Sequence, residues 1–271
     1  MTVSTVRHVV LISGGKDSTA LALYLRRKSP ESAVEYVFCD THKELPETYE
    51  YLARIEAYLG KPIVRLSSDL GDRGFDHYLK IYGGYLPAPN MRWCTRRLKI
   101  EPFERYVGDD AVLLYVGIRA DERREGYVST KPNITPVYPF RSDGIGKQDV
   151  LRILQESGVG MPEYYEWRSR SGCYFCFFQR KSEWVGLKER HPDLFARAQS
   201  YEKPDKGFTW AANESLTELS EPARVEEIRR REEERRQQLM ARRRPKNLAE
   251  AFGVKELEDP DEDPGCVICH L

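Results

Sequence analysis

The chain has 271 residues, and its 43 basic and 43 acidic side chains give a formal net charge of zero. The length allows one large domain or one domain with appendages, and the balanced charge favours no class of partner. No apolar run is long enough to span a membrane, and the N-terminus lacks the pattern of a signal peptide. We therefore expect a cytoplasmic protein without membrane contact, whose six cysteines are ligands or redox groups rather than disulfides.

Strands and helices alternate along the first half of the chain. We predict strands at residues 8–12, 33–39, 62–66 and 111–117, and helices at 17–28, 46–59, 99–106 and 148–157. This alternation predicts an α/β fold with a doubly wound, mostly parallel sheet. Ligands of such sheets bind at the carboxyl ends of the strands.

The alternation fades beyond residue 162, which indicates a helical, cysteine-bearing C-terminal extension. A helix begins at residue 181, residues 221–244 are almost wholly charged, and residues 255–264 are acidic with prolines. The charged stretch predicts a solvated helix or an arm that faces a partner. We expect a nucleotide-binding domain at 1–165, a cysteine and helical segment at 166–220, and a charged arm with a cysteine tail at 221–271.

A glycine-rich loop follows the first predicted strand and opens a helix, with the sequence Ser13-Gly14-Gly15-Lys16-Asp17-Ser18. Glycines let the backbone approach an anion closely, and the helix N-terminus presents free N–H groups and a positive dipole end. The spacing fits neither the Walker loop nor the dinucleotide-binding Gly-x-Gly-x-x-Gly. We predict that these six residues hold phosphates, with Lys16 as a cationic partner and Asp17 as a Mg²⁺ ligand.

Further candidates for the nucleotide site follow the second and fourth predicted strands. Asp40 ends the second strand, and Arg119 and Arg123 follow the fourth. Guanidinium groups suit phosphate oxygens, although charges of this kind also cap helices on exposed loops. We predict nucleotide contacts for all three residues and catalytic roles for Lys16, Asp17 and Arg119.

Cysteines form a second constellation: Cys173 and Cys176 are spaced as Cys-x-x-Cys, and Cys94 could supply a third thiolate. Alternatives are buried cysteines in an aromatic pocket, or a zinc site completed by Cys266 and Cys269. A long charged segment separates the two pairs, which favours an iron–sulfur cluster over zinc. Basic residues beside Cys94 predict contacts with nucleic-acid phosphates, namely Arg92, Arg96, Arg97 and Lys99.

Several motifs follow one another as in the phosphoadenosine-phosphosulfate-reductase-like family of the PP-loop superfamily, which the chain resembles over about residues 5–190. These motifs are the loop at 13–18, Asp40-Thr41, Pro46-Glu47-Thr48, Arg92-Trp93-Cys94-Thr95 with Lys99, Gly117-Ile118-Arg119, and Ser171-Gly172-Cys173 with Cys176. Within the family the chain is most similar to the iron–sulfur ATP-pyrophosphatase component of DNA phosphorothioation systems. The resemblance implies ATP cleavage between the α- and β-phosphates and a [4Fe–4S] cluster on Cys94, Cys173 and Cys176. A cysteine desulfurase and other subunits of a modification complex are the expected partners.

Departures from the family pattern bear on the reaction. Sulfonucleotide reductases have a degenerate loop, and those with a cluster have adjacent paired cysteines, whereas here the loop is intact and Thr95 follows Cys94. The related tRNA-thiolating enzymes usually place the Cys-x-x-Cys before the lone cysteine, whereas here the lone Cys94 comes first. This order favours a tRNA substrate less.

We therefore predict an ATP-dependent sulfurtransferase whose acceptor is nucleic acid, DNA ahead of tRNA. The alternatives are tRNA thiolation, a phosphosulfate reductase and a non-catalytic nucleotide sensor. Cys266 and Cys269 could relay sulfur as persulfides, bind a metal, or belong to an incidental tail.

Overall fold

The computed structural model describes residues 6–30, 33–123, 131–170 and 172–243. Its centre is a five-stranded sheet of order β3-β2-β1-β4-β5, in which every neighbouring pair is parallel. The strands are β1 (Arg7–Leu11), β2 (Val34–Cys39), β3 (Ile63–Leu66), β4 (Val112–Tyr115) and β5 (Ile134–Val137). The predicted α/β fold with a parallel sheet is confirmed. The sequence patterns did not predict β5, which has four residues and contains Pro136; as an edge strand it tolerates the missing N–H.

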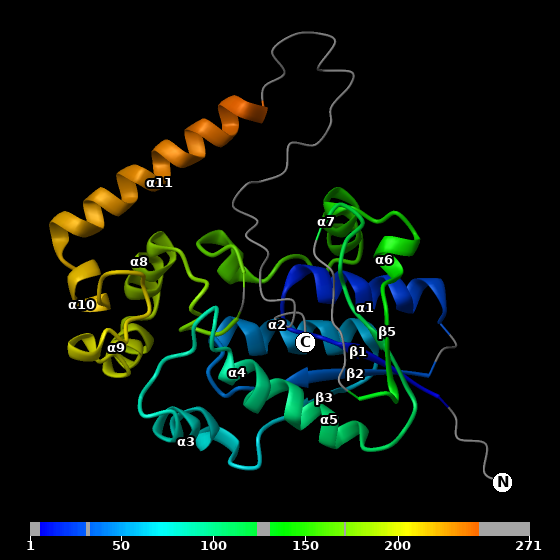
Figure 1. Ribbon diagram of the computed structural model, residues 1–271. Coiled ribbons are helices and arrows are strands. Elements are labelled where there is room, and N and C mark those ends of the chain that lie inside the picture. The colour runs from blue at the N-terminus through cyan, green and yellow to red at the C-terminus, as the bar shows by residue number, and fades with distance from the viewer. Residues whose placement is uncertain (1–5, 31–32, 124–130, 171, 244–271) are drawn as a thin grey trace. The chain divides into compact units, whose positions relative to one another are not determined.

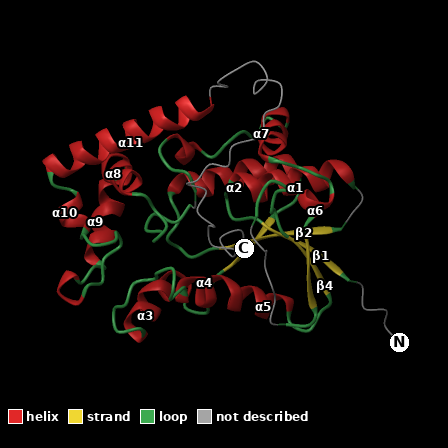
Figure 2. Cartoon of the chain, turned by 45° about the horizontal axis from the view of Figure 1, so that its top comes forward, coloured by secondary structure: helices red, strands yellow, loops and turns green. Residues whose placement is uncertain are grey.

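Helices cover both faces of the sheet (Figures 1 and 2). Side chains alternate along β1: Val10 packs in one core cluster with α1, α2 and α7, whereas Val9 and Leu11 pack in another with α5. The helices of this part are α1 (Lys16–Lys28), α2 (Pro46–Leu59), α3 (Gly74–Ile81), α4 (Trp93–Thr95), α5 (Glu101–Val107), α6 (Pro139–Ser142) and α7 (Lys147–Glu156). Shorter turns complete it: η1 (Gly71–Arg73), the π-helical η2 (Arg96–Ile100) and η3 (Glu163–Glu166).

The strand order creates a switch point beside β1. The chain runs outward from β1 through β2 to β3, and then returns to place β4 on the other side of β1. β1 and β4 are neighbouring strands, and the loops that leave their carboxyl ends run in opposite directions. Ligands of such sheets bind in the crevice between these two loops. Gly117, after β4, lies against the first turn of α1. The approach is so close that a Cβ at this position would come within 3.0 Å of the Asp17 carbonyl oxygen.

The described residues form two compact units, with the boundary between Phe177 and Phe178. Cys173 and Cys176 thus belong to the same unit as the glycine loop. The second unit is helical, which confirms the predicted helical extension; Cys266 and Cys269 lie outside the described residues. Its elements are α8 (Lys181–Arg190), α9 (Pro192–Ser200), η4 (Pro204–Lys206), α10 (Leu216–Leu219) and α11 (Pro222–Arg243). Within the described ranges, no helix combines the length and the apolar character that crossing a bilayer requires.

Candidate functional site

The glycine loop between β1 and α1 has a geometry that only glycine accommodates without strain. Gly14 has a φ of 74°, and a Cβ on it would come within 2.8 Å of Thr48 Cγ2. Gly15 immediately precedes α1 in an extended conformation. A hydrogen bond joins the two ends of the loop, in which the Ser13 N–H donates to Ser18 Oγ at 3.0 Å. The predicted strand–loop–helix arrangement is therefore present.

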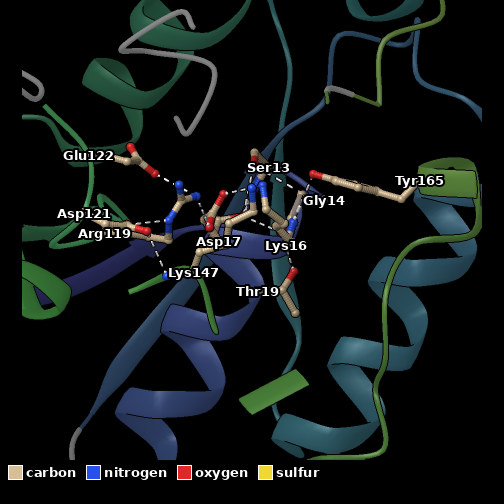
Figure 3. Close-up of polar contacts among 12 residues, drawn as sticks. Ser13, Gly14, Lys16, Asp17, Thr19, Arg119, Asp121, Glu122, Lys147 and Tyr165 are labelled. Carbon is tan, nitrogen blue, oxygen red and sulfur yellow. Dashed lines mark hydrogen bonds and ion pairs between the residues drawn. The ribbon is translucent and has the colours of Figure 1, made fainter. Parts of the chain in front are cut away.

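Two tyrosines of η3 contact this loop (Figure 3 shows Tyr165). The hydroxyl of Tyr164 donates to the Gly14 carbonyl oxygen at 2.9 Å, and the Lys16 N–H points at the Tyr165 hydroxyl oxygen at 3.4 Å. Burial raises the pKa of Tyr164 well above its ordinary value, so its hydroxyl remains a donor near neutral pH. Sequence reasoning missed both tyrosines, because no motif marks them.

Asp17 lies between two cations at the start of α1 (Figure 3). Its Oδ2 is 3.1 Å from Lys16 Nζ, and its Oδ1 is 3.0 Å from Arg119 Nη1. Burial alone would lower the pKa of Lys16, but Asp17 and Tyr165 outweigh it and the pKa lies above its ordinary value. The structure thus brings the three predicted catalytic residues together. Because both carboxylate oxygens of Asp17 face cations, its Mg²⁺ role stays a prediction.

Arg119 is enclosed by carboxylates. It is only 2% exposed, and besides Asp17 it pairs with Asp121 at 2.9 Å and Glu122 at 2.9 Å. Asp121 also accepts the Lys147 N–H at the start of α7 at 3.1 Å. These contacts fix the guanidinium beside the glycine loop.

Asp40 and Arg123 occupy different environments. Asp40 Oδ1 accepts the His42 N–H at 2.7 Å and the Tyr49 hydroxyl at 2.9 Å, so its carboxylate shapes the turn after β2. Arg123 is exposed and ends the described range 33–123. Their nucleotide contacts stay predictions.

Cys94, Cys173 and Cys176 line one pocket in the first unit. The structure thus brings together the three cysteines that the sequence singled out from distant positions. The other residues lining this cysteine pocket are mostly apolar: Thr41, Phe75, Pro87, Thr95, Leu98, Lys99, Phe175 and Phe177.

The donor set of the cysteine pocket consists of thiols, which are ligands of both zinc and iron–sulfur clusters. Among the described residues, no three His, Cys, Asp or Glu side chains are grouped as ligands of one metal ion. The cysteines of a [4Fe–4S] cluster bind different iron atoms, and therefore stand farther apart than ligands of a single ion. Three thiols line this pocket, and the choice between an iron–sulfur cluster and zinc stays a prediction.

Glu44 is the immediate partner of Cys173, and sequence reasoning missed it. The Cys173 thiol donates to Glu44 Oε1 at 3.1 Å, and the Thr41 hydroxyl donates to the same oxygen at 2.8 Å. Burial, together with the Glu44 charge, raises the pKa of Cys173 well above its ordinary value. By contrast, Cys39 does not line the pocket, and burial raises the pKa of its thiol to about 12.

The first turn of α2 contacts both the glycine loop and the cysteine turn. The Thr48 methyl faces Gly14, and a Cβ at Gly172 would collide with the Thr48 hydroxyl oxygen and come within 2.8 Å of Glu44 Oε2. The Leu45 N–H donates to the Gly172 carbonyl oxygen at 2.7 Å. One helical turn therefore joins the two candidate sites, which makes them neighbouring parts of one region.

The predicted phosphate-binding cations have different partners in the structure. Lys99 lines the cysteine pocket, whereas Arg96 and Arg97 pair with Glu101 at 3.4 and 2.7 Å. Arg92 donates from Nε to the Pro89 carbonyl oxygen at 3.1 Å. The contacts of these residues with nucleic acid stay predictions.

Solved structures with weak overall similarity include two enzymes. The phosphoadenylyl-sulfate reductase of Candida auris, in a phosphate complex, is 19% identical, with a TM-score of 0.49 over 64% of this chain and 84% of that one. A U34-tRNA thiolase from Methanococcus maripaludis with its [4Fe–4S] cluster is 15% identical, with a TM-score of 0.43 over 80% of each chain.

Sequence comparison gives one relative and one family model. An uncharacterized protein of Methanocaldococcus jannaschii is 28% identical over 220 residues, which cover 74% of this chain and 44% of that protein. The chain thus spans less than half the length of this relative. The family model of the phosphoadenosine phosphosulfate reductase domain matches residues 7–140, a range that contains the glycine loop, Cys94 and Arg119. Residues 7–140 are therefore similar in sequence to a phosphoadenosine phosphosulfate reductase domain.

Proposed function

We propose that this protein uses ATP to adenylate a nucleic-acid acceptor and then directs sulfur to the activated position. The observation that carries the proposal is the shared contact of Thr48 with Gly14 and Gly172. Through this contact, a loop suited to phosphates adjoins a turn that bears Cys173 within one compact unit. Activation and sulfur delivery at one acceptor need this proximity.

The glycine loop supplies the activation step. Its N–H groups and the N-terminus of α1 bind the phosphates of ATP, and Lys16 neutralises developing charge. Arg119 exchanges one carboxylate for a phosphate oxygen as the nucleotide enters. An acceptor oxygen attacks the α-phosphorus, the bond to the β-phosphate breaks, and pyrophosphate leaves. The adenylated oxygen is then a good leaving group, and a sulfur nucleophile displaces AMP.

The cysteine pocket supplies the sulfur step. Cys94, Cys173 and Cys176 would hold a [4Fe–4S] cluster, and a cluster with three cysteine ligands would supply an iron with an open position for sulfur. The mostly apolar lining around these cysteines would disfavour water beside a bound cluster. Zinc held by thiolates is the competing metal, and Cys266 with Cys269 could then contribute.

The acceptor that we propose is the DNA backbone, in which sulfur replaces a non-bridging phosphate oxygen. Its support is the intact loop and the arginines that precede and follow Cys94 in the sequence, since cations near a site suit a polyanion. A cysteine desulfurase is the proposed sulfur donor, acting with other subunits of a modification complex.

The test combines pyrophosphate release with analysis of the DNA product. Protein purified without oxygen is incubated with ATP, Mg²⁺, duplex DNA and a desulfurase, and the DNA is digested and searched for phosphorothioate-linked dinucleotides by mass spectrometry. Lys16→Ala should abolish pyrophosphate release. Cys173→Ala should abolish the sulfur product and retain ATP binding, whereas the matched control Cys39→Ala should behave as wild type. Pyrophosphate release that is insensitive to Lys16→Ala would contradict the proposal.

A reductase is the second candidate, favoured by the domain model that matches residues 7–140. In that case the protein would release sulfite from a sulfonucleotide with a thiol reductant, and would release no pyrophosphate from ATP. Cys266 or Cys269 would then be essential. If tRNA rather than DNA supports pyrophosphate release, the same chemistry serves tRNA thiolation. ATP binding without turnover under every condition would instead indicate a nucleotide sensor.

A further inference from the structure

Arg168 lies in the segment between η3 and the cysteine turn. The residue is 3% exposed, and its Nη2 donates to the carbonyl oxygen of Cys173 at 2.8 Å. The guanidinium carbon lies 5.4 Å from the centroid of the Trp167 ring. Its Nε and Nη1 are buried without a hydrogen-bond partner among the described residues. A charged group is therefore held inside the protein with part of its donor capacity unused.

A buried guanidinium with unused donors is unfavourable unless a negative charge lies close enough to pair with it. Arginine stays protonated in proteins, and burying a charge without a counter-charge costs several kcal/mol. A neutral donor could hold one carbonyl oxygen at lower cost. The position of Arg168 beside the cysteine turn thus indicates a negative charge that arrives after the chain has folded.

The cysteine pocket acquires negative charge when it is loaded. In the structure described above, Cys173 is a thiol that donates to Glu44. A [4Fe–4S] core carries a formal charge of about +2, and three thiolate ligands outweigh it, so the loaded pocket is more negative than the unloaded one. Glu44 is itself buried beside Cys173. A nearby cation that is not already neutralised offsets this change.

We propose that Arg168 is a positioning residue for Cys173 and, in addition to Lys99 in the pocket lining, a charge partner of the loaded cysteine pocket. Its Nη2 fixes the carbonyl oxygen of the turn, and its guanidinium charge stabilises the thiolate-bound cluster. The inference rests on the proposed function, since it requires the pocket to hold a cluster. Hydrogen bonds and net charge around a cluster tune its reduction potential and its retention.

The experiment compares two substitutions of Arg168 in the full chain, reconstituted with iron and sulfide without oxygen. Arg168→Lys retains the charge, and Arg168→Gln retains a donor but removes the charge. Arg152→Gln, at a side chain that is 63% exposed in the same unit, is the control. The readouts are iron and sulfide per chain, the rate of cluster loss to a chelator, and the midpoint potential from a redox titration followed by electron paramagnetic resonance.

We expect Arg168→Gln to lose its cluster about tenfold faster than wild type and to have a more negative midpoint potential. Removal of a positive charge disfavours the added electron. Arg168→Lys should lie closer to wild type in both readouts, and Arg152→Gln should match wild type. Equal behaviour of the lysine and glutamine variants, or a more positive potential in Arg168→Gln, would overturn the inference.

Failure of the proposed function gives a different result. A wild-type chain that takes up no iron would overturn the cluster and the role of Arg168 together. A wild-type chain that loads a cluster, with Arg168→Gln and Arg168→Lys indistinguishable, would overturn the role of Arg168 alone.

Discussion

The hydroxyl of Tyr164 donates to the carbonyl oxygen of Gly14 at 2.9 Å, although the two residues are 150 positions apart in the chain. Tyr164 is fully buried, and its η3 segment continues through Arg168 to the carbonyl oxygen of Cys173. The glycine loop is therefore held from the side of the cysteine turn as well as by its own strand and helix. A change at this hydrogen bond should affect nucleotide binding.

Tyr164→Phe should weaken ATP binding about fivefold, because one buried hydrogen bond is worth about 1 kcal/mol and orients the loop. Isothermal titration calorimetry with a non-hydrolysable ATP analogue measures this change. Tyr24→Phe is the matched control, since that hydroxyl bonds Asp143 on the surface. Equal affinities in the two variants would contradict a role for the Gly14 contact.

Arg119→Met should lower the free energy of unfolding by about 3 kcal/mol, because it removes a buried cation that pairs with Asp17, Asp121 and Glu122. The variant should also fail to release pyrophosphate. Arg152→Met, at a mostly exposed side chain, should change the free energy of unfolding by less than about 0.5 kcal/mol. Chemical denaturation measures both values. A similar stability of the two variants would show that the ion pairs around Arg119 contribute little.

Much of the fold followed from local pattern. Apolar runs mark β1 and β2, while Pro46 and Gly60 mark the two ends of α2, where Gly60 adopts a φ of 62°. The edge strand β5 escaped detection, since four residues with an internal proline carry little periodic signal. Local rules predict elements that are long or clearly bounded, and short ones depend on their neighbours in space.

The candidate site was predictable only where a motif carries its chemistry. The glycine loop and the three cysteines are such motifs. In the sequence, Glu44 and Arg168 cannot be told from ordinary charged residues. Their roles depend on burial beside Cys173, which arises only from tertiary packing. Arg119 was predicted as a phosphate ligand, but its pairing with Asp17 depends on the approach of β4 to α1, whereas its other two carboxylate partners are close neighbours in the sequence.

Gly14→Ala should lower the free energy of unfolding by about 1 kcal/mol more than Gly60→Ala does. Both glycines have positive φ, so each alanine incurs the strain of the left-handed region, about 1 kcal/mol. Only the alanine at position 14 meets an obstacle, at 2.8 Å from Thr48 Cγ2, whereas nothing lies within 4 Å at Gly60. Thr48→Ser removes that methyl group, and in its background the excess should disappear. A double-mutant cycle of unfolding free energies measures the coupling, and additive effects would contradict the contact.

Glu214→Gln should destabilise the helical second unit in a pH-dependent way. Glu214 accepts two hydrogen bonds from Arg224 of α11, at 2.8 and 2.9 Å, and pairs with Lys181 of α8. The Arg224 hydrogen bonds lower the pKa of Glu214 from 4.5 to about 2. Because the folded-state pKa lies below the unfolded one, the stabilisation is complete above about pH 4.5 and is lost as the pH falls toward 2.

We therefore expect Glu214→Gln to lower the free energy of unfolding by about 1 kcal/mol at pH 7. This difference from wild type should shrink below about pH 4.5. Circular dichroism of the full chain in a denaturant series, repeated from pH 7 down to pH 3, measures it. Glu226→Gln is the control, because that side chain is 79% exposed and lies 3.8 Å from its partner Arg229. A cost that stays constant between pH 7 and pH 3 would mean that Glu214 acts through packing, because a lost charge interaction must fade as the wild-type carboxylate becomes protonated.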